Sequence, residues 1–508
     1  MTQNALAIHG FSKDSLVELV CPGCIANGYD VPEQVNYLAR YCEQLSARTI
    51  IEEKHYMDRH YVDEFASYYS RKLSPPPNSV RRLHFFTHAF SDSDLKKWLT
   101  RGFVSLEEKS LVQREILGPP AGSNSETGYL GYAAIRPIAS VPIGRTVMCR
   151  LPGNQTPHRE IWATSRHTVH LGNLELSVDG LAFQQQDAAV GACATAALWS
   201  ALVRVARLDG MRAPTPAEIS DAAVRISLPG NRAMLPANKG LTVQQLCDAT
   251  RAFGFSPEVV TTSGRPEILV ATLHTYLLSG IPVVLALRGS GVGHAVTAVG
   301  FQLSPSENPS LKTSVPLRSS RMQKIYIHDD RLGPYARAHL IPYSVPQVGD
   351  VLVLEIEWDG KHTERWVVDC GIAPVYPKLR LSVGSLMVLA EHMADAMEAF
   401  VGPTKAKDLR ANFRYERAGD YLGKLSGRVG DPGIAAEFVS QVSLSRWCGI
   451  IRWYLGEEKL LEFVYDTTDV VRHQAIEHRE LLRAIVSLSP EGRPGAETLA
   501  EALEVPWT

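Results

Sequence analysis

The sequence predicts an α+β protein of several domains, because helical patterns precede strand patterns in the middle of the chain. Between residues 184 and 376, apolar residues first recur with a helical period and later follow the patterns of buried strands. Turn-forming stretches and changes of pattern divide the 508 residues into four parts. These are an N-terminal α/β accessory domain (1–125), a β-rich connecting segment (126–183), a central α+β domain (184–376) and a C-terminal α+β accessory domain (377–508).

Composition and charge exclude several classes of partner. The hydrophobic content of 45% and the charged content of 21% are ordinary for a soluble globular protein. A formal net charge of -2 gives no electrostatic reason to expect nucleic acid or an anionic membrane as a partner. The eight cysteines follow no regular framework, and the N-terminus lacks the pattern of a secretion signal. We therefore expect a cytoplasmic protein with free thiols, and neither nucleic acid nor membrane as a partner.

The elements of the first 183 residues alternate between helix and strand patterns. Helices are expected over 30–45, 61–69 and 92–100, and strands over 82–86, 129–136, 146–150 and 168–176. The loop Gly118–Ser125 is rich in turn-forming residues and marks the first domain boundary.

The central domain is predicted to place its helices before its strands. Thr242 and Gln245 form a capping box, in which each side chain satisfies a free backbone amide at the start of a helix. The uncharged stretch Ile268–Leu287 is long enough to suggest a membrane span, but Gly280 and Pro282 break it into a short buried helix and a buried strand. The other elements expected here are helices over 192–208 and 216–226 and strands over 283–288, 294–302, 324–329 and 350–358.

The C-terminal domain shows no reactive constellation and is interpreted as an accessory or protein-interaction domain. It is predicted to contain a helix over 385–401, a hairpin formed by 447–454 and 459–465, and a final helix over 479–486.

Cys193 is the first candidate catalytic residue. It stands where a loop of small residues becomes an apolar helix. The free amides and the dipole of a helix N-terminus favour an anion, so they lower the pKa of a thiol placed there. By itself, however, a cysteine on an apolar helix is more often a buried core residue.

His294 favours a catalytic role for Cys193 over a purely structural one. It follows a glycine-rich turn (residues 289–293) and begins an apolar strand, so that a titratable side chain lies at the mouth of a sheet. Another strand ends in Asp329 and Asp330, just before Gly333. A carboxylate in this position can orient the imidazole and stabilise its charged form. Because side chains alternate along a strand, one of the two is expected to face the site and the other to cap the turn.

These segments resemble papain-like cysteine peptidases, most closely the bacterial C39-like branch. The resemblance covers about 184–345 and rests on an upstream glutamine, Gly191–Ala197 at a helix start, Gly293–Gly300, and a strand that ends in Asp before a glycine. It implies a papain-like core with Cys193 as nucleophile, His294 as base and acid, and Asp329 or Asp330 as the orienting group. Asp329 fits the C39-like spacing to the glycine, and Asp330 fits the spacing in papain itself.

The resemblance also implies a glutamine that donates to the oxyanion formed during acyl transfer. In the family this glutamine stands six residues before the cysteine, where this chain has Asp187. A loop one residue longer would bring Gln186 to that place, whereas an ionised Asp has no proton to donate. Gln186 is therefore the candidate donor, with Gln185 or neither glutamine as alternatives.

The predicted function is cleavage of a peptide or isopeptide bond of a peptide or protein substrate, through a thioacyl intermediate and without a cofactor. Acyl transfer by the same residues, of the transglutaminase or arylamine acetyltransferase type, is the alternative enzyme. A catalytically silent binding scaffold is the alternative from another class. No metal is expected, because Cys21 and Cys24 form a single CxxC motif without two further ligands at convincing spacing.

Overall fold

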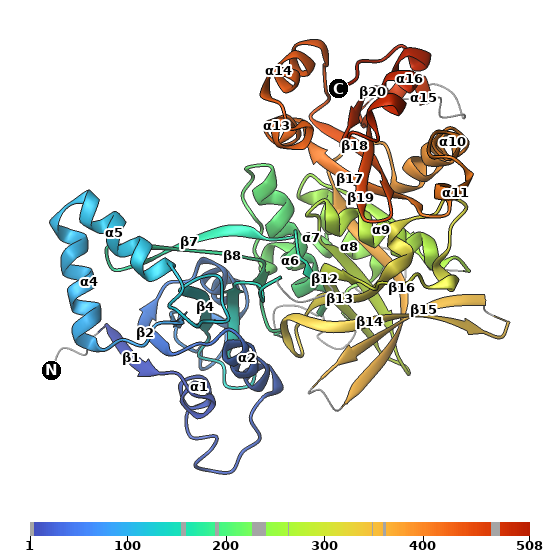
Figure 1. Cartoon of the computed structure of the whole chain (residues 1–508). Coiled ribbons are helices and arrows are strands. Elements are labelled where there is room, and N and C mark those ends of the chain that lie inside the picture. The colour runs from blue at the N-terminus through green and yellow to red at the C-terminus, as the bar shows by residue number, and fades with distance from the viewer. Residues whose placement is uncertain are drawn as a thin grey trace.

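The computed structural model of the chain describes residues 5–153, 159–187, 193–225, 240–262, 264–347, 349–358, 362–468 and 478–508. Figure 1 shows an N-terminal region in blue and cyan, a central region in green and yellow, and a C-terminal region in orange and red. One continuous apolar core joins the three regions, with buried members from Leu16 to Ala500.

The N-terminal region is built on one antiparallel sheet, in which β4, β5 and β9 continue the sheet begun by β1, β2 and β3. In sheet order its strands are β1 (Leu6–Gly10), β2 (Thr49–Tyr56), β3 (Val80–Phe86), β4 (Tyr129–Ile135), β5 (Ile143–Met148) and β9 (Ala182–Phe183). Its helices are α1 (Lys13–Val20), α2 (Glu33–Gln44), α3 (Arg59–Glu64, continued by a π-helical turn, Phe65–Tyr69), α4 (Asp92–Val104) and α5 (Leu106–Leu117). A separate hairpin of β7 (Ser165–Leu171) and β8 (Leu174–Gly180) runs from this region toward the centre of the molecule (Figure 1).

The central region is a closed antiparallel barrel of six strands. Each strand pairs with the next along the chain from β11 to β16, and β16 pairs with β11 to close the ring. The strands are β11 (Val283–Arg288), β12 (Gly293–Leu303), β13 (Met322–Asp329), β14 (Gly333–Val345), β15 (Gly349–Glu357) and β16 (Thr363–Val375). Two further strands add to it: β10 (Ser256–Thr261) pairs with β16, and β6 (Arg159–Glu160) pairs with β12.

Four helices accompany the barrel: α6 (Cys193–Leu208), α7 (Pro216–Ala223), α8 (Val243–Ala252) and α9 (Pro266–Leu278). Of these, α6 and α9 pack against its strands, α8 packs against β10, and α7 packs against α6 and α8. The predicted capping box of Thr242 and Gln245 is confirmed at the start of α8. The predicted break in the uncharged stretch is also confirmed, because α9 ends before Gly280 and β11 begins after Pro282. In the described part of the chain, no helix has both the length and the apolar character needed to cross a membrane.

The predicted fold class, an α+β papain-like (C39-like) core, is wrong. The structure combines helices with antiparallel sheets, and the central sheet closes on itself as a six-stranded barrel. Two of the strands that close it, β14 and β16, were not predicted. The Gly333–Pro334 pair that opens β14 has the composition of a turn, and Pro342 interrupts the strand pattern further on. Without these strands, the residues of the central region do not suggest a closed sheet.

The C-terminal region has a four-stranded antiparallel sheet flanked by helices. The predicted hairpin is confirmed as β18 (Trp447–Leu455) and β19 (Glu458–Asp466). The predicted helix over 479–486 is wrong, since α15 (His478–Leu481) is a single turn that leads into the strand β20 (Leu482–Ser487). The remaining elements are β17 (Leu409–Arg417), α10 (Val383–Val401), α11 (Pro403–Ala406), α12 (Ala418–Gly423), α13 (Leu425–Val429), α14 (Pro432–Gln441) and α16 (Arg493–Leu503).

Candidate active site

Three chemically reactive side chains meet where helix α6 crosses one end of the barrel. Cys193 is the first residue of α6, His294 lies at the start of β12, and Asp329 is the last residue of β13. Strands β12 and β13 are antiparallel neighbours, with Thr297 opposite His328, so the start of β12 lies beside the end of β13. Helix α6 packs against β12. The topology therefore brings together residues that are far apart in sequence.

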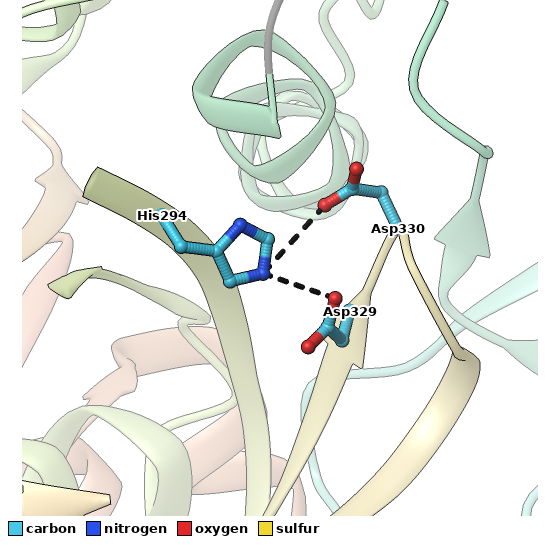
Figure 2. Close-up of side chains that lie close together, drawn as sticks. All are labelled: His294, Asp329 and Asp330. Carbon is cyan, nitrogen blue, oxygen red and sulfur yellow. Dashed lines mark hydrogen bonds and ion pairs between the residues drawn. The ribbon is translucent and has the colours of Figure 1, made fainter. Parts of the chain in front are cut away.

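The imidazole of His294 is held by the carboxylate of Asp329. Nε2–H of His294 donates to Oδ1 of Asp329 over 3.0 Å, as Figure 2 shows. Oδ1 of Asp330 lies farther from the same nitrogen, at 3.9 Å. The side chains of His294, Asp329 and Asp330 are 5%, 0% and 5% exposed, so solvent barely weakens these interactions. Of the two carboxylates, Asp329 is the one placed to orient the ring.

Cys193 approaches the opposite edge of the imidazole. Its thiol hydrogen-bonds with the His294 side chain, and this bond favours the charged ring. Because Asp329 engages Nε2, the nitrogen left for the thiol is Nδ1, which points away from both carboxylates in Figure 2. The Cys193 side chain is only partly buried, so a ligand can reach it.

The charges around His294 oppose the effect of its burial. Burial alone would lower the pKa of this histidine, but the charge and hydrogen bond of Asp329, the bond to Cys193 and the charge of Asp330 raise it to about 10. The imidazole is therefore charged at neutral pH. A buried, positively charged ring beside the thiol holds a proton that it can give to a leaving group.

The two carboxylates are pushed to opposite protonation states. Burial alone would raise the pKa of Asp329, but the charges and hydrogen bonds of His294 and Arg331 hold it well below its usual range. Burial and the negative charge of Asp329 raise the pKa of Asp330 to about 7. At neutral pH, Asp329 is therefore ionised, whereas the adjacent Asp330 is close to half-protonated.

Arg331 is a site residue that the sequence analysis did not single out. Its Nη2 donates to Asp329 Oδ2 over 2.9 Å, and its backbone N–H donates to Oδ1 over 3.0 Å. On the other side, Nη1 forms an ion pair with Glu364 Oε2 at 2.9 Å. The guanidinium lies 5.2 Å from the ring centre of Trp366 and 5.3 Å from that of Trp358. Arg331 therefore fixes the Asp329 carboxylate, and its Nε lies 3.1 Å from His294 Nε2, beside the imidazole.

Trp366 covers the histidine. Its ring centre is 5.5 Å from that of His294, with the two planes inclined by 45°. A Cβ added at Gly289 would lie only 2.8 Å from the indole ring, so glycine at this point of the β11–β12 turn lets the indole approach. The partner of this glycine-rich turn could not be foreseen, because Trp366 lies on the unpredicted strand β16.

The ligand atoms of His294, Asp329 and Asp330 all lie within 4.8 Å of one another, a distance at which three side chains could hold a metal ion. The charges around them argue for a hydrogen-bonded site instead. Both oxygens of Asp329 already accept hydrogen bonds from His294 or Arg331. A cation here would also meet the positive charges of Arg331 and His294 at close range.

Two of the glutamines upstream of Cys193, Gln184 and Gln185, hydrogen-bond with residues of the N-terminal region. Gln184 Nε2 donates to the buried carboxylate of Glu64 over 2.5 Å, and Gln185 Oε1 accepts from the backbone N–H of Ile143 over 3.1 Å. Gln185 therefore has a structural partner, which weighs against its being the oxyanion donor. Gln186 is half-buried, and it remains the predicted donor.

The start of helix α6 is described from Cys193 onward. Asp187, at the position where a glutamine was expected from the resemblance, is buried. Gly191 and Ala192, which belong to the predicted helix start, lie outside the described residues. Cys193 is the first described residue of α6, the helix that the pattern of small and apolar residues predicted.

Comparison of the chain with protein-family models, with curated proteins and with solved structures found no match in any of the three. The papain-like, C39-like resemblance stays a prediction from the residues quoted above, and the function must be argued from the site.

Proposed function

We propose that this protein is a thiol hydrolase that cleaves an amide bond, peptide or isopeptide, through Cys193, His294 and Asp329. One observation carries the proposal: His294 bonds the Cys193 thiol on one side and the Asp329 carboxylate on the other. A nucleophile, a base and an orienting group linked in this order are the parts that covalent acyl-transfer catalysis requires. The reaction needs no cofactor.

In the first half-reaction, His294 holds the thiol proton while Cys193 Sγ attacks the carbonyl carbon of the substrate. A C–S bond forms, and the π electrons of the carbonyl move onto its oxygen. When this oxyanion collapses, the C–N bond breaks, and the amine leaves with the proton from His294. The acyl group is then joined to Cys193 as a thioester.

In the second half-reaction, water attacks the thioester carbonyl and His294 accepts the proton from the water. The C–S bond breaks, Cys193 leaves as a thiolate, and the product is a free carboxylic acid. In both halves, the negative charge on the carbonyl oxygen needs hydrogen-bond donors. The backbone N–H of Cys193 and the side-chain amide of Gln186 are the donors that we propose.

The electrostatics of the site support this mechanism. With its pKa raised to about 10, His294 is charged at neutral pH and carries the proton that the leaving amine takes up. Asp329 remains ionised and fixed by Arg331, so the ring keeps one orientation while protons move at its other edge.

A cysteine-directed alkylating probe tests directly whether His294 activates Cys193. We expect iodoacetamide to label Cys193 rapidly at neutral pH, and labelling of this residue to slow strongly in His294→Ala. Cys24 provides the matched control, since it is also a partly buried free cysteine. Cys24→Ala should leave the rapid label in place, whereas Cys193→Ala should remove it. Equal labelling rates in the wild type and in His294→Ala would rule out an activated nucleophile.

The product of the reaction separates the hydrolase from its alternatives. Mass spectrometry should find proteins that accumulate with a Cys193→Ala variant, and wild-type enzyme should convert them to products with a free carboxylate. An amine adduct in place of the carboxylate would show acyl transfer. No turnover of any accumulated protein, together with slow labelling of Cys193, would indicate a binding scaffold.

We further propose that the enzyme works in the cytoplasm on a peptide or protein, with the N- and C-terminal regions contacting a protein partner. The reduced state of all eight cysteines supports a reducing compartment.

A further inference from the structure

A cavity of about 270 Å³ lies between the N-terminal sheet and the central region, on the part of α6 beyond Cys193. Trp199, Val203 and Arg207 of α6 line one wall; they are four residues apart and so share one face of the helix. The opposite side is formed by α3, β5 and β7, and the loop after α6 completes the wall. A liquid water molecule takes about 30 Å³, so the cavity has room for several small groups.

The lining is rich in positive charge. Four arginines contribute to it: Arg59, Arg145, Arg207 and Arg212. Among the described residues, only two carboxylates pair with them. Asp58 lies 2.7 Å from Arg145, and Glu218 pairs with both Arg59 and Arg212. In the described part of the chain, no carboxylate forms an ion pair with Arg207, which donates to the backbone oxygen of Arg166 over 3.0 Å. Four guanidinium groups against two carboxylates leave an excess of positive charge around the cavity.

Four residues that line the cavity each have a buried polar atom without a hydrogen-bond partner among the described residues. These atoms are His60 Nδ1, Arg145 Nε, His167 Nε2 and Trp199 Nε1. Folded proteins satisfy nearly all buried polar atoms, so four in the lining of one cavity indicate a place for a polar ligand. The side chains are held in place, since His60 packs edge-on against Trp199 with 5.4 Å between ring centres.

The two histidines add to the recognition as neutral groups. Burial and the charges of Arg145 and Arg59 lower the pKa of His60 to about 3, and burial with the charges of Arg207 and Arg145 does the same for His167. His167 also hydrogen-bonds with the backbone of Gly180 in a way that favours its charged form, as donation to a carbonyl does. Because Nε2 is unpartnered, Nδ1 donates to Gly180, and Nε2 of the neutral ring must accept a proton from its partner.

We infer that this cavity binds a phosphate group, either free phosphate or the phosphate of a small monoester. Guanidinium groups match the oxygens of phosphate and bind them in pairs. The hydroxyl of hydrogenphosphate supplies the proton that a neutral His167 accepts. Sulfate has the same shape and charge but no hydroxyl at neutral pH, so it lacks this contact. The site is separate from Cys193 and does not depend on the proposed hydrolase activity.

Calorimetric titration and thermal denaturation of the full chain test the site at constant ionic strength. Inorganic phosphate should bind saturably at millimolar or lower concentration and raise Tm, and it should bind more tightly than sulfate. Glycerol 3-phosphate is the second probe. Tighter binding of this ester than of inorganic phosphate would identify a monoester ligand, and the reverse order would identify free phosphate.

The substitution Arg207→Gln removes one charge from an exposed side chain, so the variant should fold, and it should weaken phosphate binding about tenfold. Arg251→Gln is the matched control, because it removes the same charge from an exposed arginine of α8 that does not line the cavity. Equal phosphate affinity in the two variants would overturn the inference, as would identical responses of the wild type to phosphate, sulfate and chloride. Arg212→Gln provides a second exposed position with the same expected direction of change.

Discussion

Buried histidines occupy two contrasting environments in this protein. His294 is charged, because Asp329 and Asp330 outweigh its burial and raise its pKa to about 10. His60 and His167, in the cavity along α6, are neutral, because arginines act together with burial and lower their pKa to about 3. Burial lowers the pKa of the histidine in both environments. The charge of the neighbours decides whether an imidazole serves as a proton carrier or as a neutral hydrogen-bonding group.

The substitution Asp329→Asn should have the largest effect, because it removes the charge that most strongly opposes burial at His294. We expect kcat/KM of the hydrolase to fall by about 10²–10⁴-fold. The alkaline limb of the Cys193 labelling rate should move from about pH 10 in the wild type toward lower pH. Rapid labelling with an unchanged pH profile would show that Asp329 does not control the charge of the ring. Asp330→Asn serves as the neighbouring control, since its carboxylate is 3.9 Å from Nε2.

The substitution Asp330→Asn should stabilise the protein at neutral and alkaline pH. Burial and Asp329 raise the pKa of Asp330 from 3.8 to about 7, so the folded state binds its proton more tightly than the unfolded state does. The stability that this proton contributes is fully present below pH 3.8 and is lost as the pH rises to about 7. Asparagine does not ionise, and the variant should gain about 1–3 kcal/mol above pH 7. Urea denaturation below pH 5 and above pH 7 measures the difference, and a gain of equal size at both pH values would contradict this origin.

The substitution His60→Phe should change stability at acidic pH, and its effect should be smaller than that of Asp330→Asn. The pKa of His60 is lowered from 6.5 to about 3, so its contribution to stability is present above pH 6.5 and is lost as the pH falls toward 3. Phenylalanine keeps an aromatic ring against Trp199 and cannot take up a proton. The variant should lose less stability than the wild type on acidification, by about 1 kcal/mol near pH 5. Denaturation in phosphate-free buffer measures this difference. Parallel curves of stability against pH for the variant and the wild type would contradict the prediction.

The substitution Gly289→Ala should have the smallest effect. The new methyl group would lie 2.8 Å from the Trp366 ring, so the indole must shift, and its contact with His294 changes. We expect a decrease of about two- to fivefold in kcat/KM, with little change in Tm. Gly291→Ala is not a matched control because its φ of +78° favours glycine, but Ser290→Ala in the same turn is suitable. Equal activity of Gly289→Ala and Ser290→Ala would show that the indole position is unimportant.

Local signals predicted much of the secondary structure around the site. The helix that begins at Cys193, the strand that carries His294 and the strand that ends at Asp329 all lie close to their predicted bounds. Each depends on residues near it in sequence, such as the glycines before His294. The barrel could not be predicted in this way, since its closure depends on β16, which pairs with β11 about eighty residues earlier.

The different positions of Asp329 and Asp330 relative to His294 were only partly predictable. Alternation along the strand suggested that one of Asp329 and Asp330 would face the site and that the other would cap a turn. The pairing of β13 with β14 shifts register between Ile327 and Asp329, and such an irregularity changes the direction of the side chains that follow. Both carboxylates therefore reach His294. Likewise, Gln185 has its partner, Ile143, in a strand far upstream, which no local pattern indicates.

The closed barrel has a consequence for how a polypeptide could be held beside His294. Strands β12 and β13 pair with each other from Thr297 and His328 onward, and each has its other barrel neighbour on its far side. Along this paired part the sheet offers no free backbone edge, so an extended peptide cannot add itself there as another strand. A main chain lying over this part would be held by side chains and turns, and its selection would depend on their shapes and charges.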